Sequence, residues 1–298
     1  MRGKSMSLAS KLGKKFVVTV EVDPPRGVNI DKVLDGARML ANVDAINLAD
    51  SPMARVRMSP IALAHLLKEN LRIDTILHMT CRDRNLLSLQ SELLGAYALG
   101  VENVLALTGD PPSIGDFPQA TGVFDVTSEG LVHLIRQLNS GTDLAGNRLN
   151  APTNFCIGVA VNPTAEDLDK EIDRLEHKVA SGAHFALTQP VYSCDVVHTL
   201  QHKCAHIGIP ILIGILPLRS SRHCEFLHNE VPGILIPDAI RKRMKDAGDE
   251  GGRSEGIAIA REFLTAIKSD IAGVYLMPPF ADYGMAAEVI EVLDLQRE

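Results

Sequence analysis

The sequence predicts a single-domain α/β fold, a (β/α)8 barrel in which eight parallel strands alternate with helices. Three observations favour this fold: eight short apolar runs, an amphipathic stretch between successive runs, and a length of 298 residues. One such barrel typically uses about 250 residues. An open doubly wound sheet is the alternative, but it usually carries a Gly-x-Gly-x-x-Gly turn after an early strand, and this sequence has none. We expect a flexible tail over residues 1–15 and the barrel over residues 16–298.

Each expected strand is a β-branched or apolar run bounded by turn residues. The runs are Phe16–Val22, Val43–Ala49, Asp74–Thr80, Asn103–Thr108, Asn154–Val161, His184–Gln189, Pro210–Leu216 and Ile271–Met277. The expected helices lie near residues 30–41, 59–69, 85–99, 127–139, 165–181, 195–207, 220–228, 237–247, 254–268 and 282–293. Within 165–181, apolar residues from Leu168 to Val179 recur at three- and four-residue steps, which indicates one buried helix face.

Composition indicates an enzyme that acts on a small molecule in the cytoplasm. The net charge of −7, without a block of like charge, argues against nucleic-acid binding. No apolar run approaches the roughly 20 residues of a membrane span. The five cysteines form no Cys-x-x-Cys pair, which favours a reduced protein over a disulfide scaffold or a structural zinc site. The basic N-terminal segment lacks the apolar stretch of a secretory signal. It is read as a frayed tail, with a mitochondrial presequence as the alternative.

Active sites of barrels lie at the carboxyl ends of the strands, so polar residues at those ends are the first candidates. Glu21 interrupts an apolar strand just before Pro24-Pro25. Burial would raise its pKa and make it a proton donor near neutrality, whereas the alternative is an ion pair with a Lys or Arg at the rim. His78 and Thr80 end the third strand, where a lone His beside the core is more often a structural group than a ligand. Asp50, after the second strand beside Asn47, is either a site residue or a turn residue.

The fourth strand leads into the most informative segment, Thr108-Gly109-Asp110-Pro-Pro and a long loop before Thr127. Loops of about 15 residues without secondary structure are usually functional. Gly109 permits close approach of a ligand, and Asp110 places a carboxylate at the mouth unless it only makes an Asp-Pro turn. Arg82 and Arg84, after the third strand, are candidate contacts for an anionic ligand, and Asp83 or Asn85 is equally readable as a helix N-cap.

Later strand ends add fewer polar groups. Asn162 follows the fifth strand, and we expect Thr164 to cap the next helix. On that helix Glu171, Arg174 and Lys178 share one face, which is either a solvent-exposed salt-bridged face or part of the site. Gln189 ends the sixth strand with an amide that both donates and accepts hydrogen bonds.

Several chemistries find no support in the sequence. It contains no nucleophile elbow, no P-loop and no metal-ligand cluster, so no metal is expected. No Lys ends a strand, which argues against a Schiff-base aldolase. Apolar loops with few charges instead predict a flat, largely neutral heterocycle as the ligand.

Five segments, in this order, resemble the methylenetetrahydrofolate reductase family. They are VEVDPPRG, LHMTC, LALTGDPP, HKVASGAHFALTQPVY and GILPL, and the resemblance extends from Phe16 to about Leu293. Four further stretches are similar to the subgroup fused behind homocysteine or corrinoid methyltransferase domains. They are DAINLADSPMARVRMS, HMTCRDRNLLSLQSELLGAYALG, LPLRSS and GVYLMPPF.

The resemblance implies that 5,10-methylenetetrahydrofolate and 5-methyltetrahydrofolate are interconverted by hydride transfer through a bound flavin. It implies that Glu21 is the general acid that helps to open the five-membered ring. It also implies that Asp110 stabilises the cationic iminium near the flavin and the pterin, and that Gln189 and Tyr275 bind substrate. The cofactor-binding positions implied by the family are His78, Thr80, Thr108, Gly109, Asp110, Asn162, Glu171, Arg174, His177 and Lys178.

Some of these positions depart from better-known bacterial members. Thr108 and His177 stand where those members have arginine, and Asn162 stands where they have histidine. Ser221 stands where an aromatic residue stacks on nicotinamide. FAD with NADH or NADPH is the expected pair; FMN, a flavin-free reaction and electrons from a partner protein are alternatives. A homo-oligomer is also expected. A folate- or corrinoid-linked methyltransferase and a non-catalytic subunit of an electron-transfer complex are the competing functions.

Overall fold

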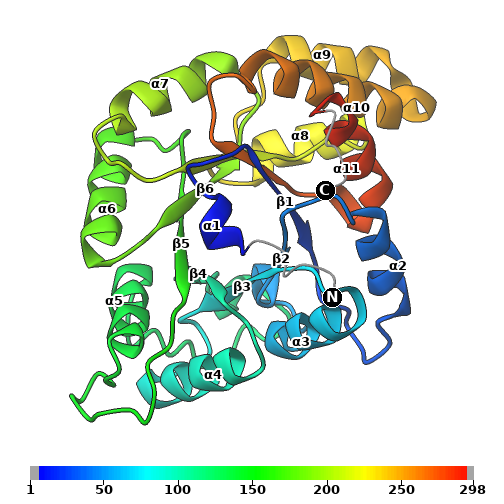
Figure 1. Cartoon of the computed structure of the whole chain (residues 1–298). Helices are drawn as coiled ribbons and strands as arrows, with labels where there is room; N and C mark the ends of the chain where they lie inside the picture. Colours follow the sequence, from blue (N-terminus) through cyan, green and yellow to red (C-terminus); the bar gives the residue numbers. More distant parts are fainter. Residues whose placement is uncertain (1–6, 294–298) are drawn as a thin grey trace.

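The computed structural model describes residues 7–293 and shows a closed barrel of parallel strands in the order β1 to β8 (Figure 1). The strands are β1 (Val17–Val22), β2 (Ala45–Leu48), β3 (Thr75–Thr80), β4 (Asn103–Leu107), β5 (Cys156–Val161), β6 (Phe185–Pro190), β7 (Ile211–Ile215) and β8 (Gly273–Leu276). The helices are α1 (Leu8–Lys11), α2 (Asp31–Met39), α3 (Pro60–Leu71), α4 (Leu86–Ala98), α5 (Ser128–Asn139), α6 (Leu168–Ser181), α7 (Cys194–Cys204), α8 (Ser221–Glu230), α9 (Asp238–Asp246), α10 (Gly248–Ile267) and α11 (Tyr283–Ile290). Short 3-10 turns are η1 (Pro52–Ala54), η2 (Pro112–Ile114), η3 (Pro279–Ala281) and η4 (Glu291–Leu293).

The structure confirms the predicted fold class and all eight strands, whose ends agree with the prediction to within two residues. The largest difference lies in α10, which begins at Gly248 rather than near residue 254. Its first turns are rich in glycine, a poor helix former, so the sequence carries no signal for the start of this helix. Gly256 is required by packing, because a Cβ there would lie 1.7 Å from the carbonyl oxygen of Leu218. The helix therefore approaches the β7–α8 loop closely.

Alternation along the strands divides the apolar residues into two layers. In β1, Val18, Val20 and Val22 face the surrounding helices, whereas Val17 belongs to a separate cluster inside the barrel. The other buried members of the inner cluster are Leu8, Ala45, Ile76, Leu105, Cys156, Phe185, Leu187, Leu212 and Tyr275. Most of these residues lie at or near the amino ends of their strands. The bottom of the barrel is therefore a packed apolar core.

The N-terminal segment closes this bottom face. Helix α1 lies across the centre of the barrel in Figure 1, and the side chain of Leu8 is fully buried in the inner cluster. The Leu8 N–H donates to Asp74 Oδ2 at 3.0 Å, and Lys11 pairs with Asp44 at 2.8 Å. The structure thus differs from the expectation of a tail over residues 1–15, because one apolar side chain anchors this segment. Residues 1–6 lie outside the described part of the chain.

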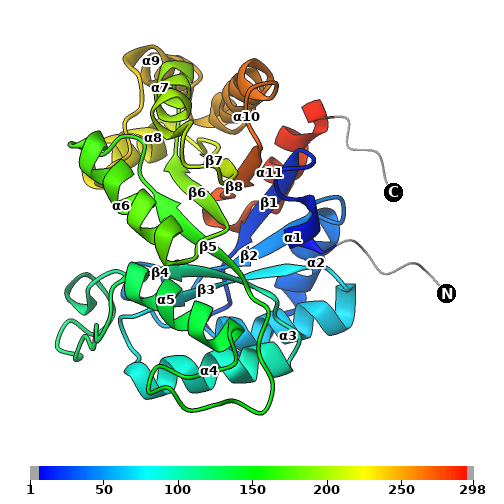
Figure 2. The ribbon, with the colours of Figure 1, turned by 60° about the vertical axis from the view of Figure 1, so that its left-hand side comes forward.

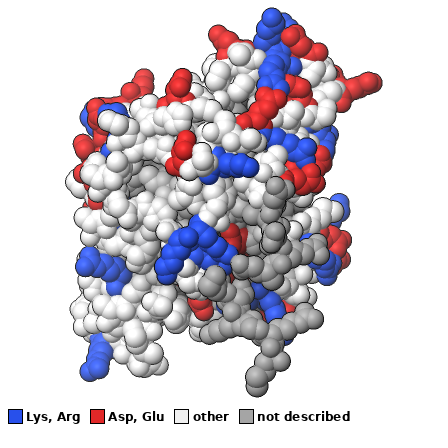
Figure 3. All heavy atoms as spheres, turned by 45° about the horizontal axis from the view of Figure 1, so that its top comes forward, with Lys and Arg blue, Asp and Glu red and all other residues white. Residues whose placement is uncertain are grey.

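The opposite end of the barrel carries the long loops. Figure 2 shows the loop between β4 and α5 extending from the side of the barrel away from α1. On the face shown in Figure 3, acidic and basic side chains are intermixed. No helix within residues 7–293 is long and apolar enough to cross a membrane.

Candidate active site

Polar side chains replace the apolar inner layer toward the carboxyl ends of the first three strands. The register pairs Glu21 of β1 with Asn47 of β2, and alternation places both on the same inner face as Val17 and Ala45. His78 and Thr80 follow Ile76 on the inner face of β3 in the same way. The structure therefore gathers these four predicted residues at one mouth of the barrel.

The hydrogen-bond partner of Glu21 lies on β8, the strand that pairs with β1 and so closes the barrel. The Tyr275 hydroxyl donates to Glu21 Oε2. Burial and, to a smaller extent, the negative charge of Asp23 raise the pKa of Glu21, the bond from Tyr275 lowers it, and the net pKa is about 7. Among the described residues no Lys or Arg pairs with Glu21, so the predicted acid is favoured over the rim ion pair. A carboxyl with this pKa can give and take a proton at neutral pH.

His78 is a neutral neighbour of this pair. Burial lowers its pKa to about 4, although the charge of Asp50 acts in the opposite direction. Its Nε2 lies 3.3 Å from Asn47 Oδ1, and its ring meets that of Tyr275 edge-on with centroids 6.4 Å apart. Asn47 Nδ2 and Thr19 Oγ1 are buried nearby and lack hydrogen-bond partners in the described structure. Such unpaired groups are uncommon in a packed core and indicate a site built for a polar ligand.

Asp50 is the centre of a buried network rather than a turn residue. Its Oδ2 accepts from the Thr80 N–H at 3.0 Å, the Thr80 hydroxyl at 2.8 Å and Arg84 Nη1 at 2.6 Å. Arg84 also donates to Glu92 at 2.6 Å. Both acidic partners of Arg84 thus belong to the protein, and Asn85 caps α4 by accepting from the Ser88 N–H at 2.9 Å, as the N-cap reading predicted.

Arg82 likewise turns inward to partners within the protein. Only 3% of its side chain is exposed; it pairs with Asp83 at 2.7 Å, and Nη1 donates to the Ser51 carbonyl at 3.2 Å. The Arg82 carbonyl also accepts from the Val123 N–H at 2.7 Å, across the loop after β4. Arg82 therefore connects the loops that follow β2, β3 and β4.

These connections position Asp110, which is exposed at the mouth. Its Oδ2 accepts from the Met53 N–H at 2.8 Å. Met53 has a φ of +56°, and such left-handed non-glycine residues persist only where their surroundings hold them. Position 109 also requires glycine, because its φ is +92° and a Cβ there would lie 2.9 Å from Thr80 Cβ. The backbone before Asp110 thus lies directly over the end of β3.

Thr108 contacts a helix end. Its Oγ1 accepts from the Ser128 N–H at 3.3 Å, in the first turn of α5. Thr127 caps the same helix by accepting from the Gly130 N–H at 3.4 Å. Thr108 therefore helps to satisfy backbone donors that a helix leaves unpaired.

The predicted α6 residues divide between barrel and solvent. Glu171 Oε1 accepts from the Asn162 N–H at 3.0 Å, and Lys178 Nζ donates to the Ala160 carbonyl at 2.8 Å. Burial lowers the pKa of Lys178. Arg174 is 71% exposed and lies 3.5 Å from Glu171, while His177 is exposed as well. The predicted shared face thus exists, but only one of its cations faces the barrel.

The cap of α6 was also predicted wrongly. Asp167, not Thr164, accepts from the N–H of Lys170 at 3.1 Å. Thr164 instead donates to the carbonyl of Gly233. The β5–α6 loop is therefore joined to the segment after α8.

Gln189 lies at the carboxyl end of β6 and is exposed at the mouth. The pairing of β6 with β7 shifts between Leu187 and Pro190. The Thr188 hydroxyl donates to the Gln189 carbonyl at 2.7 Å and accepts from the Gly214 N–H at 2.7 Å. Within residues 7–293, no hydrogen bond joins the Gln189 amide to Glu21 or Asp110, so the three residues share only the same end of the barrel.

Sequence reasoning missed the residues that surround Glu21 from outside its strand. The charge of Asp23 acts on Glu21, and Arg57 acts on Asp23. The Asp-Pro-Pro that ends β1 signalled a second carboxylate, but nothing near Arg57 indicated its position. Within residues 7–293, no group of three or more His, Cys, Asp or Glu side chains is arranged to hold a metal ion.

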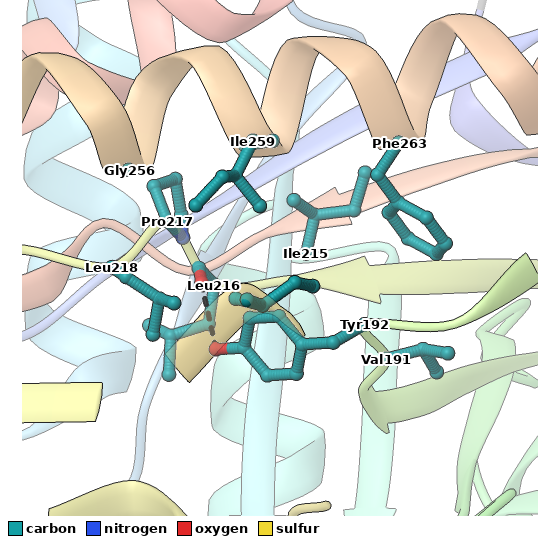
Figure 4. A pocket seen from close by; sticks show the side chains of 11 residues that line it. Val191, Tyr192, Ile215, Leu216, Pro217, Leu218, Gly256, Ile259 and Phe263 are labelled. Carbon is teal, nitrogen blue, oxygen red and sulfur yellow. Dashed lines mark hydrogen bonds between the residues drawn. The ribbon is translucent and has the colours of Figure 1, made fainter. Parts of the chain in front are cut away.

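An apolar cavity lies between α10 and the segments that follow β6 and β7. It lies beneath α10, and Figure 4 shows Tyr192, Leu216 and Phe263 among its lining residues. The Tyr192 hydroxyl donates to the Leu216 carbonyl at 2.8 Å, and the rest of the lining is apolar. This cavity is a gap in packing without groups for chemistry.

A family model described as methylenetetrahydrofolate reductase matches residues 7–278. The chain belongs to the methylenetetrahydrofolate reductase family. Methylenetetrahydrofolate reductase 1 of Schizosaccharomyces pombe is 29% identical over 210 residues, which are 67% of this chain and 32% of that protein. The 5,10-methylenetetrahydrofolate reductase of Pectobacterium carotovorum is 23% identical over 235 residues, which are 74% of this chain and 70% of that protein.

The chain thus spans 32% of the length of its fission yeast relative. Among solved structures, an uncharacterized Clostridium thermocellum protein that binds two copies of 5-methyl-5,6,7,8-tetrahydrofolic acid has a TM-score of 0.62. The likeness covers 94% of both chains at 14% identity, so it shows a shared fold. The region matched to the methylenetetrahydrofolate reductase family includes every site residue from Glu21 to Tyr275.

Proposed function

We propose that this chain is a methylenetetrahydrofolate reductase, which interconverts 5,10-methylenetetrahydrofolate and 5-methyltetrahydrofolate by hydride transfer. The observation that carries the proposal is the Glu21 carboxyl at the barrel mouth, bonded to Tyr275, with a pKa of about 7. Family membership supports the folate substrate, and the geometry supports the proton chemistry that its ring requires.

Glu21 acts as the general acid. With its pKa raised to about 7, the Glu21 carboxyl can carry a proton at neutral pH. Transfer of that proton to a nitrogen of the five-membered ring breaks its bond to the methylene carbon and leaves a cationic iminium. The Tyr275 hydroxyl, which donates to Glu21, stabilises the carboxylate that remains.

Asp110 stabilises the iminium, and Gln189 orients the pterin. Asp110 is exposed at the mouth, and the Met53 N–H holds one of its oxygens at 2.8 Å. A positioned carboxylate favours positive charge that develops beside it. The Gln189 amide can donate to and accept from the amide edge of a pterin at once.

The mouth fits the planar ring of a flavin, whereas the cation expected near the flavin phosphates already has a partner within the protein. Gly109 brings the backbone over β3, and the neutral His78 lies beside the unpaired Asn47 amide. On α6, by contrast, Lys178 already donates to the Ala160 carbonyl and lies on the same helix face as Glu171. We propose FAD, with FMN or a flavin-free reaction as alternatives; a bound flavin would carry hydride from NADH or NADPH to the folate.

The absorbance spectrum of the purified protein, recorded before and after anaerobic addition of NADH and then NADPH, tests this proposal. We expect flavin bands that bleach with one donor and return when 5,10-methylenetetrahydrofolate is added. A flavin that stays oxidised with both donors would indicate a partner protein as the electron source. A colourless protein that binds neither FAD nor FMN and does not oxidise NADH or NADPH with this folate would contradict the reductase. Methyl transfer from 5-methyltetrahydrofolate would then identify the methyltransferase alternative.

A further inference from the structure

The long loop between β4 and α5 folds back onto the loop between β2 and α3. Two of its carboxylates accept from backbone N–H groups of that loop: Asp110 Oδ2 from Met53 at 2.8 Å, and Asp116 Oδ2 from Val56 at 3.0 Å. The Asp116 N–H in turn donates to the Ala54 carbonyl at 3.2 Å. The short segment around η1 is therefore bonded at several points to the loop that carries Asp110.

The two loops approach each other most closely at Gly115. A Cβ there would lie 2.1 Å from the carbonyl oxygen of Ala54, so the contact leaves no room for a side chain. The φ of Gly115 is −103°, which any residue can adopt. Close approach, rather than backbone conformation, therefore requires glycine at this position. We call the contacts of Gly115 and Asp116 with residues 54–56 the clasp.

The segment that the clasp holds has an unfavourable backbone. Ser51, Met53 and Ala54 have φ values of +46°, +56° and +52°, in the left-handed region that residues with a side chain rarely adopt. Such a conformation persists only where the surrounding structure holds it. Arg82 holds the Ser51 carbonyl, and the clasp holds the other end of the segment. Without the clasp, the segment can relax and withdraw the Met53 N–H from Asp110.

The last part of the β4–α5 loop is attached elsewhere. The Val123 N–H donates to the Arg82 carbonyl at 2.7 Å, and Asp125 Oδ2 accepts from the Leu86 N–H at 3.1 Å. These bonds join the end of the loop to the segment after β3 and to the start of α4, whereas Asp110 lies at the beginning of the loop. Loss of the clasp should therefore displace η1 and Asp110 without releasing the whole loop.

We propose that Gly115 and Asp116 are positioning residues for Asp110. Through the clasp they fix the Met53 N–H, and this N–H fixes the Asp110 carboxylate at the mouth. The inference rests on the proposed function, in which Asp110 stabilises the cationic iminium. A charge stabilises a transition state best when it is held in place before the opposite charge develops. Gly115 and Asp116 thus act through Asp110 rather than on the folate itself.

A double-mutant cycle with Asp110 tests the proposal. Asp116→Ala should lower kcat for folate reduction about tenfold and change KM less than about twofold, because a displaced charge weakens stabilisation of the transition state. In an Asp110→Asn background, the same substitution should change kcat less than about twofold, because the charge that Asp116 positions is already absent. An equal fall in kcat in both backgrounds would overturn the positioning role.

A conservative variant separates the hydrogen bond of Asp116 from its charge. Asp116→Asn keeps an oxygen that can accept from the Val56 N–H and should retain at least about half of the wild-type kcat. The ion pair between Asp116 and Arg26, at 3.9 Å, is lost in both Asp116→Asn and Asp116→Ala, so the comparison isolates the hydrogen bond. An Asp116→Asn variant as slow as Asp116→Ala would contradict the clasp.

Matched substitutions control for general effects on the loop and on glycine positions. Asp125→Ala removes the same kind of bond from the same loop, and Gly95→Ala adds a Cβ on α4 with no atom within 4 Å. Both should keep kcat within about twofold of the wild type. Gly115→Ala should lower kcat at least as much as Asp116→Ala, because its Cβ forces the two loops apart.

Hydrogen–deuterium exchange over residues 50–58 tests the clasp independently of the reaction. These amides should exchange at least about fivefold faster in Asp116→Ala than in the wild type or Asp125→Ala. Unchanged exchange would overturn the proposal and leave the reductase intact. Absence of folate reduction by the wild type would contradict the proposed function, whereas exchange would still decide whether Asp116 holds Met53. If Gly115→Ala does not fold, the variants of Asp116 decide alone, because Asp116 is exposed.

Discussion

The two ends of the barrel use the same inward-facing positions of the same strands for opposite purposes. At the bottom, Val17 and Ile76 pack around Leu8, which is 0% exposed. At the mouth, the same faces carry Glu21 and His78, whose pKa values burial moves in opposite directions, to about 7 and about 4. Buried apolar groups stabilise the fold, whereas buried ionisable groups cost stability and supply chemistry. The comparison predicts that substitutions at the bottom of the barrel change stability, whereas substitutions of the ionisable groups at the mouth change activity.

The largest effect on stability is expected at the bottom. Leu8→Ala should lower the free energy of unfolding by about 3 kcal/mol, because it removes a fully buried side chain. Folate turnover should remain, since Leu8 lies in the apolar cluster at the other end. Denaturant unfolding and steady-state assays measure the two effects, with Leu87→Ala, at a residue that is 78% exposed, as the control. Loss of activity in a folded Leu8→Ala protein would break the separation.

A change at the loops of the mouth should affect both properties. Arg82→Met leaves the Ser51 carbonyl without this donor and should lower the free energy of unfolding by about 2 kcal/mol. It should also lower kcat more than it changes KM, because Arg82 positions the loop whose Met53 N–H holds Asp110. Arg55→Met changes an exposed arginine in the same loop and should do neither. Unchanged kcat would show that Asp110 does not depend on this network.

A smaller effect is expected from the partner of the proposed acid. Tyr275→Phe removes a hydrogen bond that lowers the pKa of Glu21, so that pKa should rise by roughly one unit. Because the protonated acid is required, the alkaline limb of the pH profile of folate reduction should move to higher pH. Tyr97→Phe, on α4, should leave the profile unchanged. A shift to lower pH would contradict the assigned direction.

The same comparison explains what the sequence could and could not predict. Apolar runs identified all eight strands, and a carboxylate within one run identified Glu21, because alternation is a local signal. The contacts of Arg82 and Arg84 could not be predicted in this way, because Ser51 and Asp50, to which they donate, are distant in the chain. Asp50, which accepts from Arg84, is 34 residues away in the chain, and nothing in the loop sequence indicates that pairing. Similarly, Asp167 and Thr164 were both suitable caps, and only tertiary contacts show that Thr164 bonds to Gly233.

At Leu8 the sequence predicted less structure than the protein has. A short basic segment with one apolar residue reads as a tail, because no periodicity marks it. Its fixed position depends on the cavity that eight strands leave at the bottom of the barrel, which no local pattern describes. Distant contacts therefore account for both kinds of failure.

The measurement that tests the central claim most directly separates the two half-reactions in Glu21→Gln. Folate reduction should fall by at least about a hundredfold, because the acid is gone, while flavin reduction by the nicotinamide should be unchanged. The wild type should lose stability as pH rises from 4.5 to about 7, since the folded protein holds the Glu21 proton more strongly, and the variant should lose less of it over that range. A cooperative unfolding transition in Glu21→Gln shows that the variant is folded. Folate reduction that survives, or an equal loss of both half-reactions, would contradict the role of Glu21.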